Sequence, residues 1–148
     1  VGFSIIEDLS QLTGDVVENA PYLEGLFLPG EWGGCNQVYR LDSSKLGVIG
    51  HFSYAEDREG VDQPVLVYTN IAFVFDPETR KPEGLHIIGT RKCYPGTEAK
   101  LPHLCDCAFT SGIVMREDGY ADLYSGLGDC REGRTVIPYP FEGYGKIV

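Results

Sequence analysis

The hydrophobic positions along this chain follow a period of two over seven short segments. These segments are residues 36–41, 46–54, 65–75, 85–90, 109–116, 120–126 and 134–138. Alternating apolar and polar residues are typical of strands, and the unbroken β-branched and aromatic segment 65–75 indicates a strand buried on both faces. The pattern therefore predicts an all-β protein of antiparallel strands with little or no helix.

Turn residues connect the predicted strands. Asp118-Gly119 stands between two alternating segments and is a strong hairpin signature, because glycine readily takes the positive φ of a two-residue turn. Residues 42–45 form a second polar turn, and residues 76–79, which begin with Asp-Pro, form a third. Residues 1–6 are compatible with another strand, whereas residues 7–29 show no sustained period and predict mostly loop.

The strands fall into two groups of three or four, separated by a longer polar segment at residues 91–106. Such groups are typical of propeller blades or of the sheets of a sandwich. The spacing between the groups is close to the ~40 to 50 residues of a propeller blade. We therefore expect antiparallel β-propeller-like blades within a single β domain that spans residues 1–148.

Composition supports a turn-rich β protein and excludes several functions. The 148 residues include 19 glycines, 9 prolines and one methionine, and the net charge is −10. So acidic a chain has no broad attraction for nucleic acid or an anionic membrane surface, and its apolar stretches are far shorter than the ~20 residues that cross a bilayer. An odd number of cysteines, five, and no visible signal peptide favour a cytoplasmic location.

The segment from Gly30 to Gln37 carries the first candidate chemistry. Trp32 offers a stacking surface, Asn36 and Gln37 offer amide donors and acceptors, and the glycines let the backbone approach a ligand. Such a set suits a neutral, hydroxyl-rich ligand such as a sugar. A tight turn with a core tryptophan explains the same residues about equally well.

Arg91, Lys92 and Lys100 gather positive charge in one loop of an acidic chain. Cations collected in this way bind anions, and the arginine fork matches a phosphate or a carboxylate. The alternative is a solvated surface with Glu98 as an ionic partner, and composition alone somewhat favours it.

Acidic residues at two strand ends are candidate catalytic groups. Asp106 comes just before a predicted strand that contains Ser111, and it is suited to general acid or base chemistry when partly desolvated. Asp129 follows a predicted strand, where it either binds sugar hydroxyls or caps the turn. His51 is a further candidate for polar contacts with a ligand.

Two cysteines, Cys105 and Cys107, flank Asp106, and His103 lies nearby. Their C-x-C spacing lacks the paired C-x-x-C of a structural zinc site, so we expect no metal. At positions i and i+2 of a strand entry two thiols point to the same side, which indicates small residues packed in the core.

Several segments, taken in order along the chain, resemble one known family. They are Asn36-Gln37, residues 46–51, 73–79, 87–92, 109–113, 123–129 and 137–141. They cover most of the chain from residue 30 onward and are similar to the domain-of-unknown-function family 1861. The family looks like a distant relative of five-bladed β-propeller glycosidases and of β-mannoside phosphorylases. The resemblance implies a propeller whose central funnel binds carbohydrate.

The resemblance also implies family members about twice this length. The present chain matches the C-terminal part of the family pattern, so we expect a partial five-bladed propeller whose N-terminal blades are missing. On this basis the protein would be carbohydrate-active, as a glycoside hydrolase or phosphorylase. Asp106 would donate a proton to the leaving oxygen, with Asp129 or Glu31 as the second carboxylate.

The expected substrate contacts follow from the same interpretation. A phosphorylase would need no cofactor but would use inorganic phosphate as co-substrate, bound by the cationic loop. A sugar ring would stack on the tryptophan, while amides, an imidazole and a hydroxyl would bind sugar hydroxyls. The expected substrate-binding residues are Trp32, Asn36, Gln37, His51, Arg91, Lys92, Lys100 and Ser111.

Two other interpretations remain open. The first is a non-catalytic sugar-binding or assembly module, in which the same aromatic and amide groups bind without chemistry. A partial propeller exposes unpaired strand edges, which favour a homo-oligomer or pairing with missing N-terminal blades. The second is an inactive truncated fragment. We expect no nucleic acid or membrane as a partner.

Overall fold

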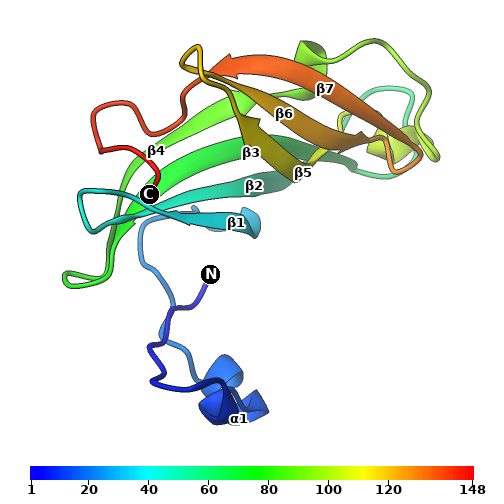
Figure 1. Cartoon of the computed structure of the whole chain (residues 1–148). Coiled ribbons are helices and arrows are strands. Elements are labelled where there is room, and N and C mark those ends of the chain that lie inside the picture. The colour runs from blue at the N-terminus through cyan, green and yellow to red at the C-terminus, as the bar shows by residue number, and fades with distance from the viewer.

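Seven antiparallel strands in two sheets make up most of the molecule. The computed structural model describes residues 1–148, and Figure 1 shows the second sheet lying over the first. Each sheet is a meander in chain order, β1-β2-β3-β4 in the first and β5-β6-β7 in the second. The strands are β1 (Trp32–Arg40), β2 (Leu46–Glu56), β3 (Val65–Asp76), β4 (Lys81–Gly89), β5 (Ala108–Met115), β6 (Tyr120–Leu127) and β7 (Arg131–Pro138).

Helix is confined to one short α-helix and three single 3-10 turns. These are α1 (Gly14–Glu18), η1 (Leu9–Gln11), η2 (Arg91–Cys93) and η3 (Pro102–Leu104). No helix of this chain has the length and hydrophobicity of a membrane-spanning segment. The expected all-β fold of antiparallel, propeller-like blades is therefore confirmed.

The predicted turns are confirmed where their chemistry is most specific. Between β3 and β4, Asp76 Oδ1 accepts hydrogen bonds from the backbone N–H of Glu78 at 2.9 Å and of Thr79 at 3.3 Å. In the β5–β6 turn Gly119 has φ +83°, which glycine adopts without steric cost. Asp118 Oδ1 accepts from the N–H of Tyr120 at 3.2 Å, so both turns are closed by local contacts.

The expected strand boundaries need correction at several places. β1 begins at Trp32 rather than residue 36, because the two glycines that hide the alternation continue the ladder to β2. Trp32 therefore lies on the same strand as Asn36 and Gln37 rather than in the segment before it. β4 and β7 also begin earlier than expected, at residues 81 and 131. Residues 1–6 form no strand and contribute one isolated bridge, between residues 2 and 22.

An apolar cluster joins the two sheets. Its fully buried side chains include Phe141 after β7, Ile49 on β2 and Leu123 on β6, each with no exposed surface. Complete burial of one such side chain contributes roughly 1.5–3 kcal/mol. The cluster also contains Leu41, Ala72, Val74, Ile113, Ala121 and Ile137.

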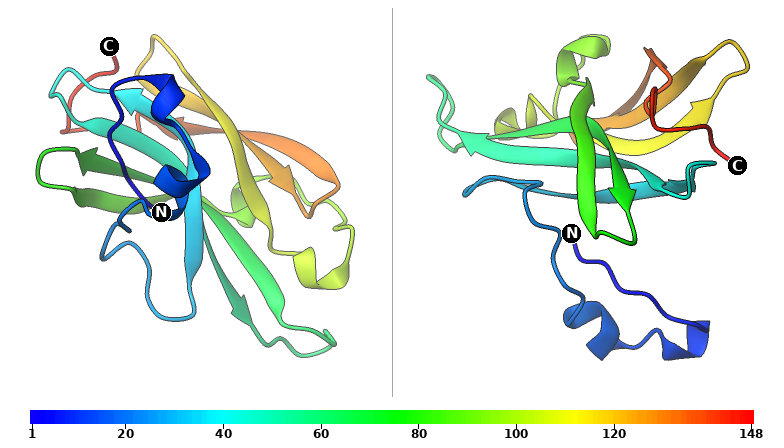
Figure 2. Two further views of the ribbon diagram at one scale, coloured as in Figure 1. Left: turned by 90° about the horizontal axis from the view of Figure 1, so that it is seen from below. Right: turned by 90° about the vertical axis from the view of Figure 1, so that its left-hand side faces the viewer.

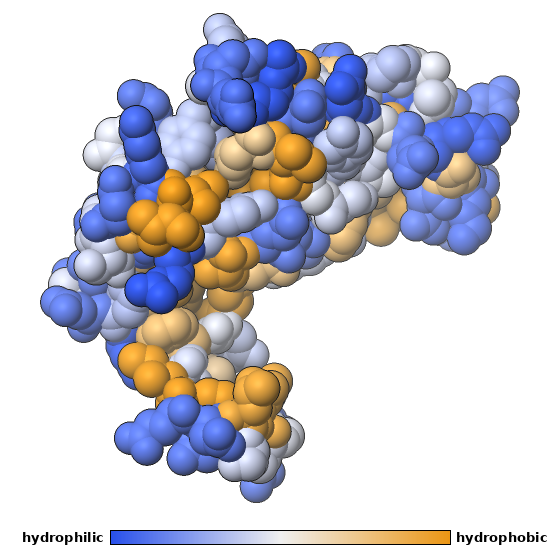
Figure 3. Space-filling model, viewed as in Figure 1, coloured by the Kyte–Doolittle hydropathy of each residue, from blue (hydrophilic) through white to orange (hydrophobic).

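A second cluster covers the opposite face of the first sheet. It contains Phe73 and Phe75 of β3, and Phe3 from the N-terminal segment meets Phe75 edge to face at a centroid distance of 4.6 Å. The segment 65–75 is thus buried on both faces, as its unbroken apolar sequence predicts. The remainder of the N-terminal segment, with α1, extends away from the sheets (Figures 1 and 2). It shows apolar surface at the bottom of Figure 3. Ile5 and Leu9 of this segment are exposed.

A layer of polar side chains also lies between the sheets. Asn70 on β3 is completely buried, and its Nδ2 lies 2.8 Å from Thr110 Oγ1 and 3.0 Å from Ser125 Oγ. Its Oδ1 accepts a hydrogen bond from Tyr94 OH at 3.0 Å. Buried polar groups are costly without partners, so this layer favours one register between the sheets.

The C-terminal segment returns from β7 to the turn between β1 and β2. The backbone N–H of Asp42 donates to Lys146 O at 2.8 Å, and that of Val148 donates to Arg40 O at 3.1 Å. Because Phe141 inserts between the sheets on the way, this segment links the edge of the first sheet to the end of the second.

Candidate aromatic site between the two sheets

Four aromatic side chains meet where both sheets approach each other. Trp32 Nε1 donates to Tyr68 OH at 3.3 Å, and the two rings meet edge to face. His51 lies 4.5 Å from Phe109 and 6.0 Å from Tyr68, measured between ring centroids. Trp32, His51, Tyr68 and Phe109 are called the aromatic cluster below. Such a surface, with polar atoms at its edge, suits an amphipathic ring such as a pyranose.

Strand register places these side chains together. Trp32 pairs with Ser53 on β2, and Ser53 pairs with Tyr68 on β3, so both aromatic rings stand on the same face of the sheet. Gly34 is opposite His51, and a Cβ at Gly34 would lie 2.9 Å from the imidazole Cε1. The glycine in this position therefore leaves the space that the imidazole ring occupies.

The two predicted amide ligands have different partners. Asn36 Oδ1 lies 2.9 Å from His51 Nδ1, at the edge of the aromatic cluster. Gln37 Oε1 instead accepts the backbone N–H of Ile113 on β5 at 2.8 Å. That bond connects β1 to β5, the first strands of the two sheets. The side-chain oxygen of Gln37, which the sequence predicts to bind a sugar, is therefore engaged within the protein.

Asp106 is connected to the cluster through the backbone and to a cation through its side chain. Its carbonyl oxygen accepts the N–H of Tyr68 at 3.1 Å, and its carboxylate receives Arg58 Nη2 at 2.6 Å. Arg58 also donates to Glu56, and its hydrogen bonds to these two carboxylates raise its pKa above the ordinary arginine value. The side chain of Asp106 is 24% exposed, so it is partly desolvated but still accessible.

A separate shallow pocket of about 580 Å³ brings together two other predicted residues, Ser111 and Asp129. Asp129 pairs with Lys100 at 3.2 Å, and both side chains are more than half exposed. Asp129 has φ +60°, which an aspartate adopts more readily than most residues in a turn. The structure therefore brings Ser111 and Asp129 together in a pocket whose lining contains no residue of the aromatic cluster, and Lys100 joins them through its ion pair with Asp129.

The remaining predicted residues make contacts within their own segments. Glu31 Oε2 accepts the N–H of Leu28 at 2.7 Å and so closes the turn that precedes β1. The guanidinium of Arg91 donates to the carbonyl oxygens of Pro95 and Thr97, at 2.9 and 3.3 Å, and orders its own loop. Lys92 is exposed and has no hydrogen-bond or ionic partner in the protein.

Sequence reasoning missed three residues of this region: Arg58, Tyr68 and Phe109. The sequence predicts only the kind of segment in which each residue lies: a charged loop for Arg58, and strands for Tyr68 and Phe109. The alternation in 65–75 does place Tyr68 on the same face as Asn70, and a polar residue inside an apolar strand was the available signal. Their meeting with Trp32 depends on pairing between distant strands.

The thiols beside Asp106 differ from one another. Cys107 is buried as expected, and burial raises the pKa of its thiol. Cys105 is exposed, so the expectation that both thiols pack in the core is wrong for it; it lies in a turn after η3, before β5 begins. No group of three or more His, Cys, Asp or Glu side chains is arranged to hold a metal ion.

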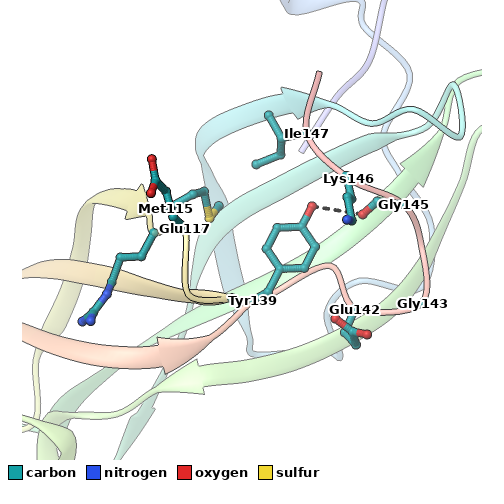
Figure 4. A pocket seen from close by; sticks show the side chains of 10 residues that line it. Met115, Glu117, Tyr139, Glu142, Gly143, Gly145, Lys146 and Ile147 are labelled. Atoms are coloured by element: carbon teal, nitrogen blue, oxygen red, sulfur yellow. Dashed lines mark hydrogen bonds between the residues drawn. The ribbon is translucent and has the colours of Figure 1, made fainter.

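A cavity of about 490 Å³ lies beside the β5–β6 turn and the C-terminal segment (Figure 4). Met115, Tyr139 and Ile147 supply its apolar wall, and Tyr139 OH donates to Gly145 O at 3.0 Å. None of the predicted site residues lines it. We therefore assign the candidate site to the aromatic cluster and Asp106.

Comparison with known proteins identifies one matching family and several similar structures. The family described as "Protein of unknown function (DUF1861)" matches residues 1–143. MPT-4, a mannose phosphorylase from Leishmania mexicana whose structure holds a phosphate ion, is 51% identical with a TM-score of 0.93. MPT-1, a GDP-Man-dependent mannosyltransferase from the same organism, is 45% identical, also with a TM-score of 0.93. No curated protein matches.

The chain corresponds to about half of each similar structure. The alignments cover 99% of this chain but 46% of MPT-4 and 48% of MPT-1. A hypothetical protein from Leishmania major shows the same relation, with 50% identity, a TM-score of 0.88 and 46% of its length covered. The fold of this chain therefore recurs inside proteins of roughly twice its length.

Proposed function

This chain belongs to the DUF1861 family, and on that premise we propose that it contributes the sugar-binding part of a carbohydrate-active enzyme that transfers a mannosyl group to or from phosphate. The observation that carries the proposal is the similarity to MPT-4, at 51% identity over 99% of this chain. A phosphorylase is favoured over a hydrolase because the similar proteins are a phosphorylase and a transferase.

The aromatic cluster supports the sugar-binding role. Trp32 and Tyr68 present ring faces and edges at the open end of β1, with Trp32 37% exposed. A pyranose has apolar C–H faces that pack on aromatic rings and hydroxyls that need partners at the rim. Asn36 and His51 are suited to supply those partners.

Asp106 is the candidate acid and base. In phosphorolysis a phosphate oxygen bonds to the anomeric carbon, the glycosidic C–O bond breaks, and the leaving oxygen takes a proton from a carboxylic acid. Among the predicted acidic residues, Asp106 is the one whose backbone is joined to the aromatic cluster, because its carbonyl oxygen accepts the N–H of Tyr68. Asp129 and Glu31 stay secondary candidates, because Asp129 pairs with Lys100 and Glu31 closes a turn.

The basic loop remains the proposed site for inorganic phosphate. Lys92 has no partner in the protein and is exposed, whereas Arg91 is engaged by carbonyl oxygens of its own loop. Phosphate binding at this loop would therefore depend first on the ammonium group of Lys92, with Arg91 holding the loop in shape.

We also propose that the complete active site needs further blades. The face of the second sheet that is turned away from the core exposes Val114, Tyr124 and Val136. Exposed apolar residues gathered on one sheet face mark an interaction site, and the similar structures have about as much chain again to cover it. The present chain would be the C-terminal blades of such a propeller.

A chimeric enzyme tests this proposal directly. The chain replaces the matching part of MPT-4, and formation of mannose 1-phosphate from a manno-oligosaccharide and phosphate is measured. We expect an active chimera, and Asp106→Asn should lower kcat/KM by roughly a hundredfold or more, which is typical for loss of general acid–base catalysis. Asp57→Asn, an exposed aspartate one residue before Arg58, is the matched control.

Two results would count against the proposal. One is a folded chimera without any phosphorolysis or mannosyl transfer, and the other is unchanged turnover in Asp106→Asn. The non-catalytic alternative rests on the half-length coverage of the similar structures. Isothermal titration of the chain alone against manno-oligosaccharides distinguishes this alternative from the enzyme. A non-catalytic binding module should release heat when the saccharide binds, and its chimera should show no turnover.

A further inference from the structure

Asn36 occupies an irregular position on β1. The register to β2 shifts between Cys35 and Gln37, which pair with Gly50 and Ile49, so that Asn36 is the extra residue of a β-bulge. Bulges bend a strand locally and re-aim the side chain of the extra residue, and they are frequent beside functional sites. Here the re-aimed side chain lies against His51.

The contact favours one ring nitrogen as the carrier of the proton. Asn36 presents its carbonyl oxygen to His51 Nδ1 at 2.9 Å, and a carbonyl oxygen only accepts hydrogen bonds. With the amide in this orientation Nδ1 donates, and in the neutral ring Nε2 keeps an unprotonated lone pair. Nε2 has no hydrogen-bond partner within the protein, although the ring packs at 4.5 Å against Phe109.

We infer that Asn36 is a positioning residue that holds His51 in its Nδ1–H tautomer, so that Nε2 accepts a hydrogen bond from a sugar hydroxyl at the aromatic cluster. This inference rests on the proposed function for the identity of the ligand, but not for the tautomer. The bulge supplies the geometry, and Gly34 leaves room for the ring.

The surroundings of His51 keep the ring neutral. Burial lowers the pKa of His51 below its ordinary value. Tyr68 is the titratable side chain packed against it, and its hydroxyl accepts from Trp32. Two charged side chains lie near this region, Asp106, whose backbone bonds to Tyr68 on β3, and Arg58. They are paired with each other. No carboxylate forms a hydrogen bond or an ion pair with the ring, whose hydrogen-bond partner is the neutral amide of Asn36.

The pH dependence follows from the sign of this shift. Above the lowered pKa the ring is neutral and Nε2 accepts; as pH falls through it, Nε2 gains a proton and can only donate. Sugar binding should therefore weaken on the acid side. Asn36→Asp places an anion at Nδ1, which favours the imidazolium and raises the pKa of His51, so binding should weaken at a higher pH than in the parent protein.

The first experiment needs no ligand. Long-range ¹H–¹⁵N NMR of labelled imidazoles reports the tautomer and the titration of each histidine, and His86→Gln, an exposed residue on β4, assists assignment and serves as control. We expect the Nδ1–H form for His51 in the parent protein and a mixture of tautomers in Asn36→Leu. An Nε2–H form in the parent protein would overturn the inference.

The second experiment adds manno-oligosaccharides and measures affinity by isothermal titration across pH. Asn36→Leu should lose roughly fivefold to tenfold in affinity at neutral pH, the effect of about one hydrogen bond, while His86→Gln binds as the parent does. Affinity that is indifferent to pH and to Asn36→Leu would overturn the acceptor role. If neither the parent protein nor the chimera binds a saccharide, the proposed function and the acceptor role both fail, while the NMR result still decides the positioning by Asn36.

Discussion

The space between the two sheets changes character along each strand. On β3 the inward side chains pass from Val74, which is apolar, to Asn70, and on β6 they pass from Leu123 to Ser125. One half of the layer is therefore hydrocarbon, and the next half is a hydrogen-bonded polar network. Both halves are almost completely buried, so the difference lies in chemistry rather than in exposure.

The two halves stabilise the fold in different ways. Apolar contacts are non-directional and tolerate small displacements, whereas each hydrogen bond of Asn70 requires its partner at one place. The polar half also reaches the candidate site, because Thr110 Oγ1 donates to Gly50 O at 2.6 Å, next to His51. We conclude that the apolar half supplies most of the stability and that the polar half sets the alignment of the strands that carry the site.

Removal of the largest apolar side chain between the two sheets, that of Phe141, should have the greatest effect on stability. Phe141 is completely buried, and its ring lies where a Cβ at Gly47 would approach it to 2.7 Å. Phe141→Ala should lower the free energy of unfolding by about 3–5 kcal/mol, through lost burial and the cavity left behind. Urea denaturation measures it, with Phe141→Leu as a milder control. A loss below about 1 kcal/mol would show that the apolar half is not the main source of stability.

Loss of the central amide should have a smaller but clear effect. Asn70→Leu leaves Tyr94 OH and Thr110 Oγ1 each without one buried contact, and should cost about 1–3 kcal/mol in urea denaturation. Because strand alignment depends on it, the amide exchange of β2 and β5 should also become faster. Ser125→Ala removes one hydroxyl of the same layer and is the control. If Asn70→Leu lowered the free energy of unfolding as much as Phe141→Ala does, the polar half would contribute as much stability as the apolar half, contrary to our conclusion.

The ion pair at the candidate site should affect function more than stability. Arg58 and Asp106 are both partly exposed, so Arg58→Met should change the free energy of unfolding by no more than about 1 kcal/mol. In the chimera it should lower kcat/KM at least about tenfold, because Asp106 loses the partner that orients it. Lys45→Met, which breaks the comparable pair with Glu83 at the other end of the sheet, is the control for stability. Turnover unaffected by Arg58→Met would separate Asp106 from the chemistry.

The exposed ion pair between Lys100 and Asp129, at the edge of the shallow pocket, should have the smallest effect. Lys100 and Asp129 are 61% and 62% exposed, and solvent screens their attraction. Lys100→Met should therefore change the free energy of unfolding by less than about 0.5 kcal/mol, measured by thermal and urea denaturation. A larger change would mean that the loop contributes to the packing of the second sheet.

Much of the fold was predictable from local sequence. The hairpin at Asp118-Gly119 and the turn at Asp76 follow from residues within a few positions of each other, and the structure confirms both. The alternation predicts a start of β1 that is too late, because glycines interrupt the pattern that marks a strand. Gln37 shows the corresponding limit for function, since an amide that suits a sugar binds the backbone of β5 instead.

The sequence alone determined the strands, the turns and the all-β class, because alternation and turn chemistry act over a few neighbouring residues. It also identified Trp32, Asn36 and His51 as polar or aromatic groups suited to a sugar. Only the tertiary structure decided that Trp32 meets Tyr68, which is 36 residues away, and that Phe109 closes the cluster from the other sheet. The physical reason is that strand register and the packing of one sheet on another depend on contacts between distant segments, which no local pattern records.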